Sequence, residues 1–442
     1  MTRRFSGKNA SFWVASEHRS RTVWLVMVAT LVLCGCKGRQ LMPTPNLFAD
    51  SETDPFAEVV PELQTNKVDV LYLTDRVPVE RKDGTLRYGY ERSQSLAFGS
   101  CIVEIGKDLT WEVLVENSRR RQRSVPLPLT VQTITEHARF PATPLPFVPD
   151  GSSFKDDPAT VARVVEIAEI FRRELQERLA LTARKEAYIF IHGYNNTFED
   201  AVFVIAELWH FMGRGGVPIA YTWPAGHPGL LRGYTYDRES GEFTIFHLKQ
   251  LLRFLASCPE LQKIHIIAHS RGTDVATSAV RELIIESRAR GVDPKAEWRI
   301  DNILLAAPDL DMQVVSQRLG AERFFFGVKR LTIYVSQSDK AIGIASWLFA
   351  SEHRIGRLRY EDLSPAQQAA LASVRGISIV DARVRTSGIG HGYFHSNPAV
   401  SSDVILLLRD DREPGAVNGR PLFEHAPNYW ELREGYPQAT SD

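Results

Sequence analysis

One short segment of the chain carries a serine in a setting suited to nucleophilic chemistry. Residues 263–272 read KIHIIAHSRG, so an apolar run ends in a turn with Ser270 at its apex, and the residues that follow can form a helix. A strained strand–turn–helix of this kind exposes the serine hydroxyl above a sheet, and it needs small residues two positions before and after the serine. Ala268 and Gly272 meet that need. The pattern predicts that Ser270 is a nucleophile, and helix capping is the simpler alternative.

A serine nucleophile requires a histidine base and an acid that orients the base. In strand–turn–helix sites these partners follow the serine in the order acid, then histidine. His391 lies in the glycine-rich segment 388–394 (GIGHGYF), and Asp339 closely follows an apolar run at 331–335. The sequence therefore predicts His391 as the base and Asp339 as the acid. Asp309, which follows an earlier apolar run, is the alternative acid, although an acid there also suits a helix N-terminus.

Backbone N–H groups that could stabilise a developing oxyanion occur at two points of the sequence. The first is the amide of Arg271, directly after the serine, and the second belongs to the loop that follows the run IFIHG at 189–193. Gly193 allows the backbone to approach the reacting carbon, so the amide of Tyr194 or Asn195 is the predicted donor. Each donor held ready in such a site is worth about 2.7–4 kcal/mol. A turn that only reverses the chain is the alternative.

Two histidines, His265 and His269, raise the alternative of a metal-assisted reaction. Both lie on the run that leads into the serine turn, and the sequence contains no HExxH motif. Because that motif is what places two histidines on one helix face around zinc, we expect neither a metal nor another cofactor in the site.

The elements that must position these residues are short apolar runs that alternate with helical segments. The runs are 187–192, 218–223, 263–268, 302–307, 331–335 and 377–380. Each is nearly continuous in apolar residues, as expected for a strand covered on both faces. Strands separated by helices in this way predict an α/β fold, with a doubly wound, mostly parallel sheet and helices on both faces. Further strand signals occur at 68–74 and 96–105, and helical spacing begins at about 159.

The N-terminus resembles the signal peptide of a bacterial lipoprotein. Residues 22–36 carry no charge and follow a basic flank. Since a membrane span needs about 20 residues, this apolar stretch has signal-peptide length. It ends in LCGC at 33–36, which resembles a lipobox. The resemblance implies cleavage after Gly35, acylation of Cys36 and a lipid anchor in the cell envelope, on the periplasmic side of the inner or outer membrane. An uncleaved anchor is the alternative.

The remaining organisation follows from composition and turn signals. We expect residues 1–35 to be the signal peptide and residues 36–61 to be a flexible tether. The hydrolase domain is expected to consist of N-terminal strands with an irregular extension at 62–157 and a catalytic core at 158–412, followed by a C-terminal tail at 413–442. The arginines between 119 and 123 are expected in a solvated loop, with anionic lipid headgroups as the alternative contact. After cleavage only Cys101 and Cys258 accompany Cys36. A disulfide between them is possible in that compartment, but two isolated, buried thiols are favoured.

The overall charge excludes some functions. Lys and Arg together number 53, and so do Asp and Glu, while 44% of residues are hydrophobic. This balance hides a division, because residues 1–35 carry five basic residues and one acidic one, and the rest is slightly acidic. Without a large basic excess, general nucleic-acid binding is not expected. Four cysteines are too few for a disulfide-dense scaffold.

Taken together, the motifs resemble a bacterial α/β-hydrolase family of unassigned substrate, known as a domain of unknown function in the esterase and lipase superfamily. The matching segments are 74–76 (TDR), 91–93 (ERS), 95–99, 191–195, 222–224 (TWP), 236–239 (YDRE), 268–272, 307–309 (APD) and 390–394. The resemblance implies a serine hydrolase acting on a small-molecule or lipid ester. A non-catalytic envelope protein that uses this fold for binding is the alternative. The sequence leaves the oligomeric state open.

The residue after the nucleophile departs from the pattern of similar proteins, which commonly have methionine there. The side chain of Arg271 is expected to pair with an acid such as Asp237 or Glu239, with an anionic substrate group as the alternative.

Only 23 residues separate the runs that end at 307 and begin at 331, too few for a large cap domain. We therefore expect an open cleft, partly covered by segments 226–241 and 341–360.

Overall fold

The computed structural model describes residues 39–343, 354–386 and 388–438. The expected signal peptide, Cys36 and part of the expected cover at 341–360 lie outside these residues. Leu41–Asp442 forms one compact unit, and the following description concerns that unit.

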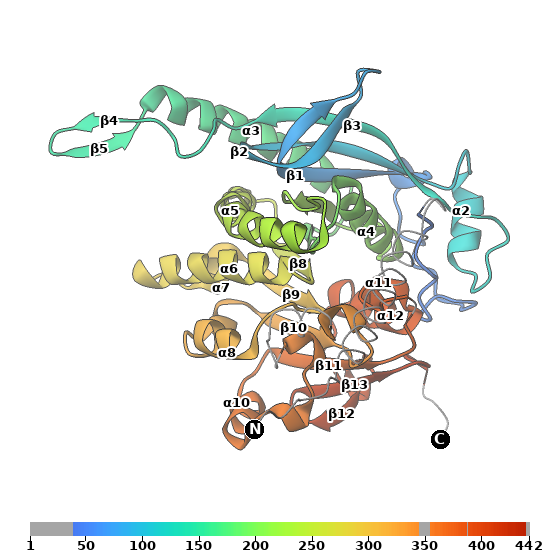
Figure 1. The fold of residues 1–442 in the computed structure, drawn as a ribbon. Coiled ribbons are helices and arrows are strands. Elements are labelled where there is room, and N and C mark those ends of the chain that lie inside the picture. Colours follow the sequence, from blue (N-terminus) through green and yellow to red (C-terminus); the bar gives the residue numbers. More distant parts are fainter. Residues whose placement is uncertain (1–38, 344–353, 387, 439–442) are drawn as a thin grey trace, which may run out of the picture. The chain divides into compact units, whose positions relative to one another are not determined.

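A large sheet organises the described residues, with strand order β12-β13-β11-β10-β9-β8-β6-β7-β1-β2-β3. The N-terminal strands lie at one end of the sheet and the C-terminal strands at the other (Figure 1). The strands from β1 to β13 in this order pair in parallel, while β2, β3 and β12 join antiparallel. The strand bounds are β1 (Lys67–Glu80), β2 (Leu86–Ile105), β3 (Leu129–Arg139), β6 (Glu186–Ile191), β7 (Val217–Thr222), β8 (Lys263–His269), β9 (Ile300–Ala306), β10 (Arg330–Val335), β11 (Ile377–Arg383), β12 (Phe423–Ala426) and β13 (Tyr429–Arg433). The predicted α/β class and mostly parallel sheet are confirmed.

Helices cover both faces of the sheet. Successive residues of a strand point to opposite faces, so each strand contributes side chains to two cores. Tyr188 and Phe190 of β6 belong to a core shared with α4 (Phe198–Phe211) and α12 (Pro398–Leu408). Ile189 and Ile191 belong to a second core, shared with α3 (Pro158–Ala180), α5 (Leu230–Ser257) and α6 (Gly272–Ala289). The smaller helices are α2 (Trp111–Ser118), α7 (Pro294–Trp298), α8 (Met312–Val315), α10 (Pro365–Ser373) and α11 (Tyr393–Ser396). Continuous apolar runs such as AYIFI therefore mark strands buried on both faces.

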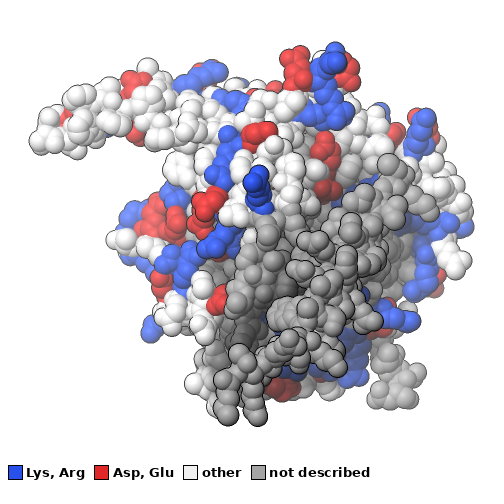
Figure 2. Space-filling model, viewed as in Figure 1, with Lys and Arg blue, Asp and Glu red and all other residues white. Residues whose placement is uncertain are grey.

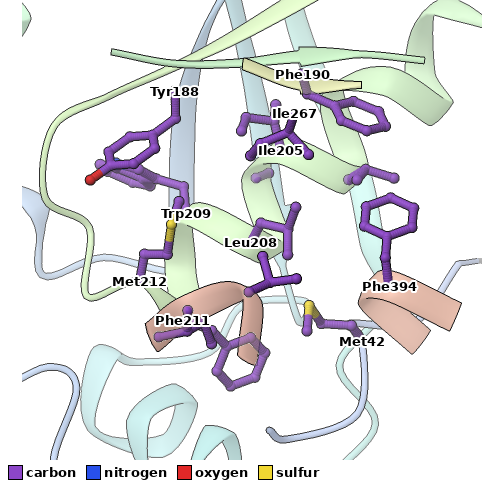
Figure 3. Close-up of a cluster of buried hydrophobic side chains, with 14 of the residues drawn as sticks. Met42, Tyr188, Phe190, Ile205, Leu208, Trp209, Phe211, Met212, Ile267 and Phe394 are labelled. Carbon is purple, nitrogen blue, oxygen red and sulfur yellow. The ribbon is translucent and has the colours of Figure 1, made fainter. Parts of the chain in front are cut away.

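Figure 3 shows how the first of these cores joins distant parts of the chain. Phe190 of β6 and Ile267 of β8 contribute from the sheet, and Leu208 contributes from α4. Met42 comes from the N-terminal segment, and Phe394 comes from α11. Each fully buried side chain of this size stabilises the fold by about 1.5–3 kcal/mol.

The strand order reverses between β6 and β8. From β6 the chain continues to β7 on one side, and it then returns to β8 on the other side. In open parallel sheets, the loops at such a switch point diverge and leave a crevice beyond the carboxyl ends of the strands. Ile191 of β6 pairs with Ala268 of β8 at this end. The loops that begin at His192 and Ser270 therefore start side by side.

The stretch 106–157, expected as an irregular extension, contains regular structure. It forms α2, then β3, which pairs antiparallel with β2, and then the hairpin of β4 (Phe147–Asp150) and β5 (Ser153–Asp156). In Figure 1 the hairpin projects beyond the sheet. Strand β3 escapes an analysis based on apolar runs, because polar and apolar residues mix along it and it pairs at the edge of the sheet.

The described part of the expected tether, residues 39–61, is not a free linker. Leu41, Met42 and Phe48 are buried, and the Leu41 amide donates to the carbonyl of Leu127. The guanidinium of Arg123 donates to the carbonyls of Leu41 and Met42. The prediction of a flexible tether up to residue 61 is therefore wrong. A segment without periodicity can still pack against the fold through a few buried apolar side chains.

The arginines between 119 and 123 attach this same N-terminal segment. Besides Arg123, Arg119 donates to the carbonyl of Ser51 at 3.1 Å, and Arg121 donates to the side chain of Asn46 at 3.2 Å. Arg120 and Arg121 are exposed, as expected for a solvated loop, but the cluster also contacts the protein's own backbone and side chains.

The expected C-terminal tail also belongs to the fold. Strand β13 extends the parallel sheet beside β11, and β12 pairs with β13. The fully buried Arg420 donates to both carboxylate oxygens of Asp403 in α12, at 2.8 and 2.7 Å. Such a paired, bidentate contact in the interior fixes the segment to α12. The tail prediction is wrong because strands this short give little periodicity.

The charges of the described surface are mixed in sign. Figure 2 shows basic and acidic side chains interspersed over the described part of one face.

Cys101 and Cys258 are both buried free thiols, as the sequence favoured. Burial raises the pKa of the Cys101 thiol. Within the described residues, no helix combines the length and the apolar character needed to cross a bilayer.

Candidate active site

Ser270 occupies the turn between β8 and α6. Its φ of 53° lies in the left-handed region, which costs a residue with a side chain about 1–3 kcal/mol and persists only where the surroundings impose it. The Ser270 amide donates to the carbonyl of Ala306 at 2.9 Å, and its carbonyl accepts from the Thr273 side chain at 2.6 Å. The turn is thus held at both ends, in the strained conformation expected of a nucleophile elbow, the name used below for residues 268–272.

Small residues at the elbow are required by close packing. A Cβ atom on Gly272 would lie 2.2 Å from the carbonyl oxygen of His192. A Cβ atom on Gly193 would lie 2.6 Å from the Cβ and 3.2 Å from the Oγ of Ser270. The backbone that follows β6 therefore lies directly against the serine.

The structure brings His391 and Asp339 together. Nδ1 of His391 lies 2.8 Å from Oδ2 of Asp339, and Oδ1 of Asp339 accepts from the Ile342 amide at 3.1 Å. Asp339 is fully buried, whereas the side chain of His391 keeps 16% of its surface exposed. The Lys340 amide also donates to the carbonyl of Ile389 at 3.0 Å, which joins the acid loop to the histidine loop.

His269 connects this pair to the elbow. Its Nε2 lies 3.0 Å from the carbonyl oxygen of His391, and the two imidazole rings are 4.6 Å apart. Burial holds the pKa of His269 well below its ordinary value, so the ring is neutral, with Nε2 carrying the proton that it donates. His391 is thereby placed beside the residue that precedes Ser270.

The alternative acid, Asp309, lies near the elbow but has other partners. Its amide donates to the carbonyl of Ser270 at 3.4 Å. Its carboxylate accepts from the hydroxyl of Tyr234 at 3.0 Å and forms an ion pair with Arg354. Asp339, and not Asp309, is therefore the acid that contacts His391.

Of the two loop amides predicted as oxyanion donors, one has a defined partner. The amide of Asn195 donates to Oδ2 of Asp237 at 2.8 Å, so it is directed away from this role. The amide of Tyr194 stays a predicted donor. Within the part of the chain that the structure describes, no acceptor lies within hydrogen-bond reach of the backbone N–H of Arg271, the other candidate.

The side chain of Arg271 pairs with a residue that the sequence analysis did not consider. Its guanidinium lies 2.7 Å from the carboxylate of Asp274, one turn along α6. Asp237, one of the two expected partners, instead accepts from the amides of Asn195 and Gly226. The expected pairing with an acid is therefore present, but the partner is Asp274 and not Asp237 or Glu239, because contact three residues along a helix is the shorter route for the side chain.

Part of the expected cover is visible around the site. The N-terminal half of α5 supplies Tyr234, whose ring centroid lies 5.5 Å from that of Tyr194.

The described residues contain no group of three histidine, cysteine or acidic side chains that could hold a metal ion. His265 is buried within β8, and its Nδ1 accepts from the side-chain amide of Asn302 at 2.9 Å.

The comparisons with known proteins agree with this architecture. The model of a family described as alpha/beta hydrolase of unknown function (DUF900) matches residues 167–410, more than half of the chain. The chain belongs to this family. The matched residues of this α/β hydrolase include Ser270, Asp339 and His391.

Two solved structures are similar to parts of this α/β hydrolase. A CIB-like hydrolase from Thermoplasma acidophilum shares 14% identity over 52% of this chain and 88% of its own, with a TM-score of 0.30. Acyl-protein thioesterase 2 from Zea mays shares 12% identity over 57% of this chain and 84% of its own, with a TM-score of 0.24. Among curated proteins, no match is found.

From the sequence, neither Arg76 nor Asp237 was assigned to the loop beside the serine. Arg76 and Asp237 both contact the loop that follows β6, which we call the oxyanion loop (residues 192–197). They lie in the family-like segments TDR and YDRE, and that membership was the only signal that could have marked them.

Proposed function

We propose that this α/β hydrolase is a serine hydrolase that cleaves a carboxylic ester, or a related acyl bond, of a small-molecule or lipid substrate. The observation that carries the proposal is the contact between His391 and Asp339 beside a strained serine turn. A buried acid that orients a partly exposed histidine next to a nucleophile is the arrangement that activates a serine hydroxyl.

The proposed reaction begins with attack of the Ser270 Oγ on the acyl carbon, while His391 accepts the hydroxyl proton. Asp339 stabilises the resulting imidazolium. The negative charge on the substrate oxygen is stabilised by the amides of Arg271 and Tyr194, and by the N-terminus of α6. Collapse of the tetrahedral intermediate expels the alcohol, which takes its proton from His391, and leaves the acyl group on Ser270. Water, deprotonated by His391, then attacks the acyl-enzyme and releases the carboxylic acid.

Covalent labelling with a fluorophosphonate probe tests the proposal directly. Wild-type protein should be labelled at Ser270, and Ser270→Ala should not react. A panel of p-nitrophenyl esters of increasing acyl length then defines the preferred acyl group. Absence of labelling in the wild type, or equal labelling of Ser270→Ala, would refute the hydrolase and favour a binding role for the fold.

We also propose that the protein is anchored in a bacterial cell envelope by lipid on Cys36. The support is the charge-free stretch at 22–36 that ends in LCGC, a few residues before the folded unit begins at Leu41. Two or more acyl chains on one cysteine suffice for stable anchoring. Metabolic labelling with radioactive palmitate should mark the wild type and leave Cys36→Ala unlabelled and released from membranes, while labelling of both proteins would contradict the anchor.

A further inference from the structure

A buried arginine lies behind the oxyanion loop. Arg76 of β1 is 1% exposed, and its guanidinium donates to the carbonyls of Asn196, Ala225 and Gly89, each at 2.9 Å. Burial lowers the pKa of Arg76 to about 10, so the group stays charged at neutral pH. A buried cation of this kind is retained only where several acceptors surround it. Here those acceptors come from strand β2 and from two loops, one of which is the oxyanion loop.

The same guanidinium orients His192, which opens that loop. Burial, together with the charge of Arg76, lowers the pKa of His192 to about 3, so the imidazole is neutral. Nδ1 of His192 faces the carbonyl of Gly193 at 3.0 Å and must carry the proton. Nε2 therefore accepts, and Arg76 donates to it at 3.3 Å. The ring also stacks on Trp223, whose Nε1 donates to the His192 carbonyl at 2.8 Å.

A buried carboxylate holds the tip of the same loop. Asp237 of α5 is 1% exposed. It accepts from the amide of Asn195 at 2.8 Å and from the amide of Gly226 at 3.1 Å. Hydrogen bonds from backbone amides to a carboxylate are charge-assisted, which makes them shorter and stronger than neutral ones.

Between these contacts lies the amide that the proposed reaction needs. Arg76 holds the loop at His192 and Asn196, and Asp237 holds it at Asn195. Gly193 lies against Ser270 within the same segment. We infer that Arg76 and Asp237 are positioning residues that keep the oxyanion loop in its productive geometry. This inference rests on the proposed function, because it assigns to that function two residues that do not touch the substrate.

The consequence is specific to the transition state. A displacement of about 1 Å at such a loop reduces turnover by about 10²-fold. Substrate binding is governed by the rest of the cleft, so KM should change little. A substitution that loosens α5 but leaves the oxyanion loop in place should change neither turnover nor KM.

Asp237→Asn is the principal test variant, because it keeps the side-chain volume and one acceptor while it removes the charge. Arg76→Met, which removes the donors, is the second. The matched control is Arg92→Met. Arg92 also ties α5 to the strands, by donating to Ser240 at 2.8 Å and to the carbonyl of Tyr236 at 2.9 Å, without contacting the oxyanion loop.

Two measurements decide the inference. On a p-nitrophenyl ester, Asp237→Asn should lower kcat about 10- to 100-fold with KM within about twofold, whereas Arg92→Met should retain kcat. In hydrogen exchange read by mass spectrometry, the peptide that covers residues 187–198 should exchange about 10-fold faster in Asp237→Asn than in wild type or Arg92→Met.

The outcomes separate the inference from the proposed function. Unchanged kcat and unchanged exchange in Asp237→Asn would overturn the positioning role, and so would an equal loss of kcat in Arg92→Met. A wild type that neither hydrolyses esters nor reacts with the fluorophosphonate would overturn the proposed function alone. The exchange data would then still show whether Asp237 holds the loop. If Arg76→Met does not fold, Asp237→Asn carries both measurements.

Discussion

Nδ1 of His391 lies 2.8 Å from Oδ2 of Asp339, although 52 residues separate them in the sequence. The contact exists because Asp339 follows β10 and His391 follows β11, and these strands are parallel neighbours with Val335 opposite Asp381. Parallel strands end at the same edge of a sheet, so loops far apart in the chain meet there. The elbow after β8 opens at this same edge, and the following predictions concern the groups gathered there.

The first prediction separates the two candidate acids. Asp339→Asn should lower kcat by about 10⁴-fold, the loss expected when a triad histidine loses its orienting carboxylate. Asp309→Asn should cost less than about 10-fold, since Asp309 pairs with Tyr234 and Arg354. Initial rates with a p-nitrophenyl ester measure both, and a larger loss at Asp309 would reverse the assignment.

The second prediction concerns the close approach of Gly193 to the serine. In Gly193→Ala, the new Cβ would lie 2.6 Å from the Cβ of Ser270, so the loop or the elbow must move. Turnover should fall by about 10²-fold or more. Gly241→Ala in α5 is the control, because its Cβ would meet Val275 at an ordinary 3.5 Å. Equal ester hydrolysis by wild type and Gly193→Ala would show that the approach has no catalytic consequence.

A third prediction follows from the low pKa of His192. Burial and then the charge of Arg76 lower that pKa to about 3 in the folded protein, whereas an unfolded histidine titrates near pH 6.5. Between these values the unfolded chain binds the extra proton, so the free energy of unfolding should fall as pH falls from about 6.5 towards 3, by up to about 1.4 kcal/mol per pH unit for this group. Urea unfolding at several pH values measures the slope. His192→Gln should flatten it, and an identical slope in the variant would rule out this contribution.

The fourth prediction concerns the docked N-terminal segment. Arg123→Met should destabilise the protein by about 1–3 kcal/mol, because it removes the donors to the carbonyls of Leu41 and Met42. Arg120→Met should cost less than about 0.5 kcal/mol, since Arg120 forms an exposed pair with Glu116. Urea unfolding gives both values, and limited proteolysis should cut residues 41–61 faster in Arg123→Met only. Equal stability of the two variants would show that the Arg123 side chain does not contribute to docking of the segment.

Much of the framework of the candidate site could be predicted directly from the sequence. The six core strands were predictable because a strand buried on both faces must be continuously apolar, and AYIFI and KIHIIA satisfy that condition. The elbow was predictable because a strained turn tolerates only small flanking residues. Edge strand β3 and the short β12 and β13 were not predictable in this way, since mixed or very short patterns do not distinguish a strand from a loop.

By itself, the sequence determined the fold class, the turn that carries Ser270 and the candidate partners His391, Asp339 and Asp309. Only the tertiary structure decided that Asp339 contacts the histidine and that the amide of Asn195 is directed to Asp237. It alone revealed that Arg76 lies behind the oxyanion loop. The physical reason is that secondary structure and turn strain depend on neighbours along the chain. The partner of a buried charge depends on which distant loops the strand order brings to the same edge of the sheet.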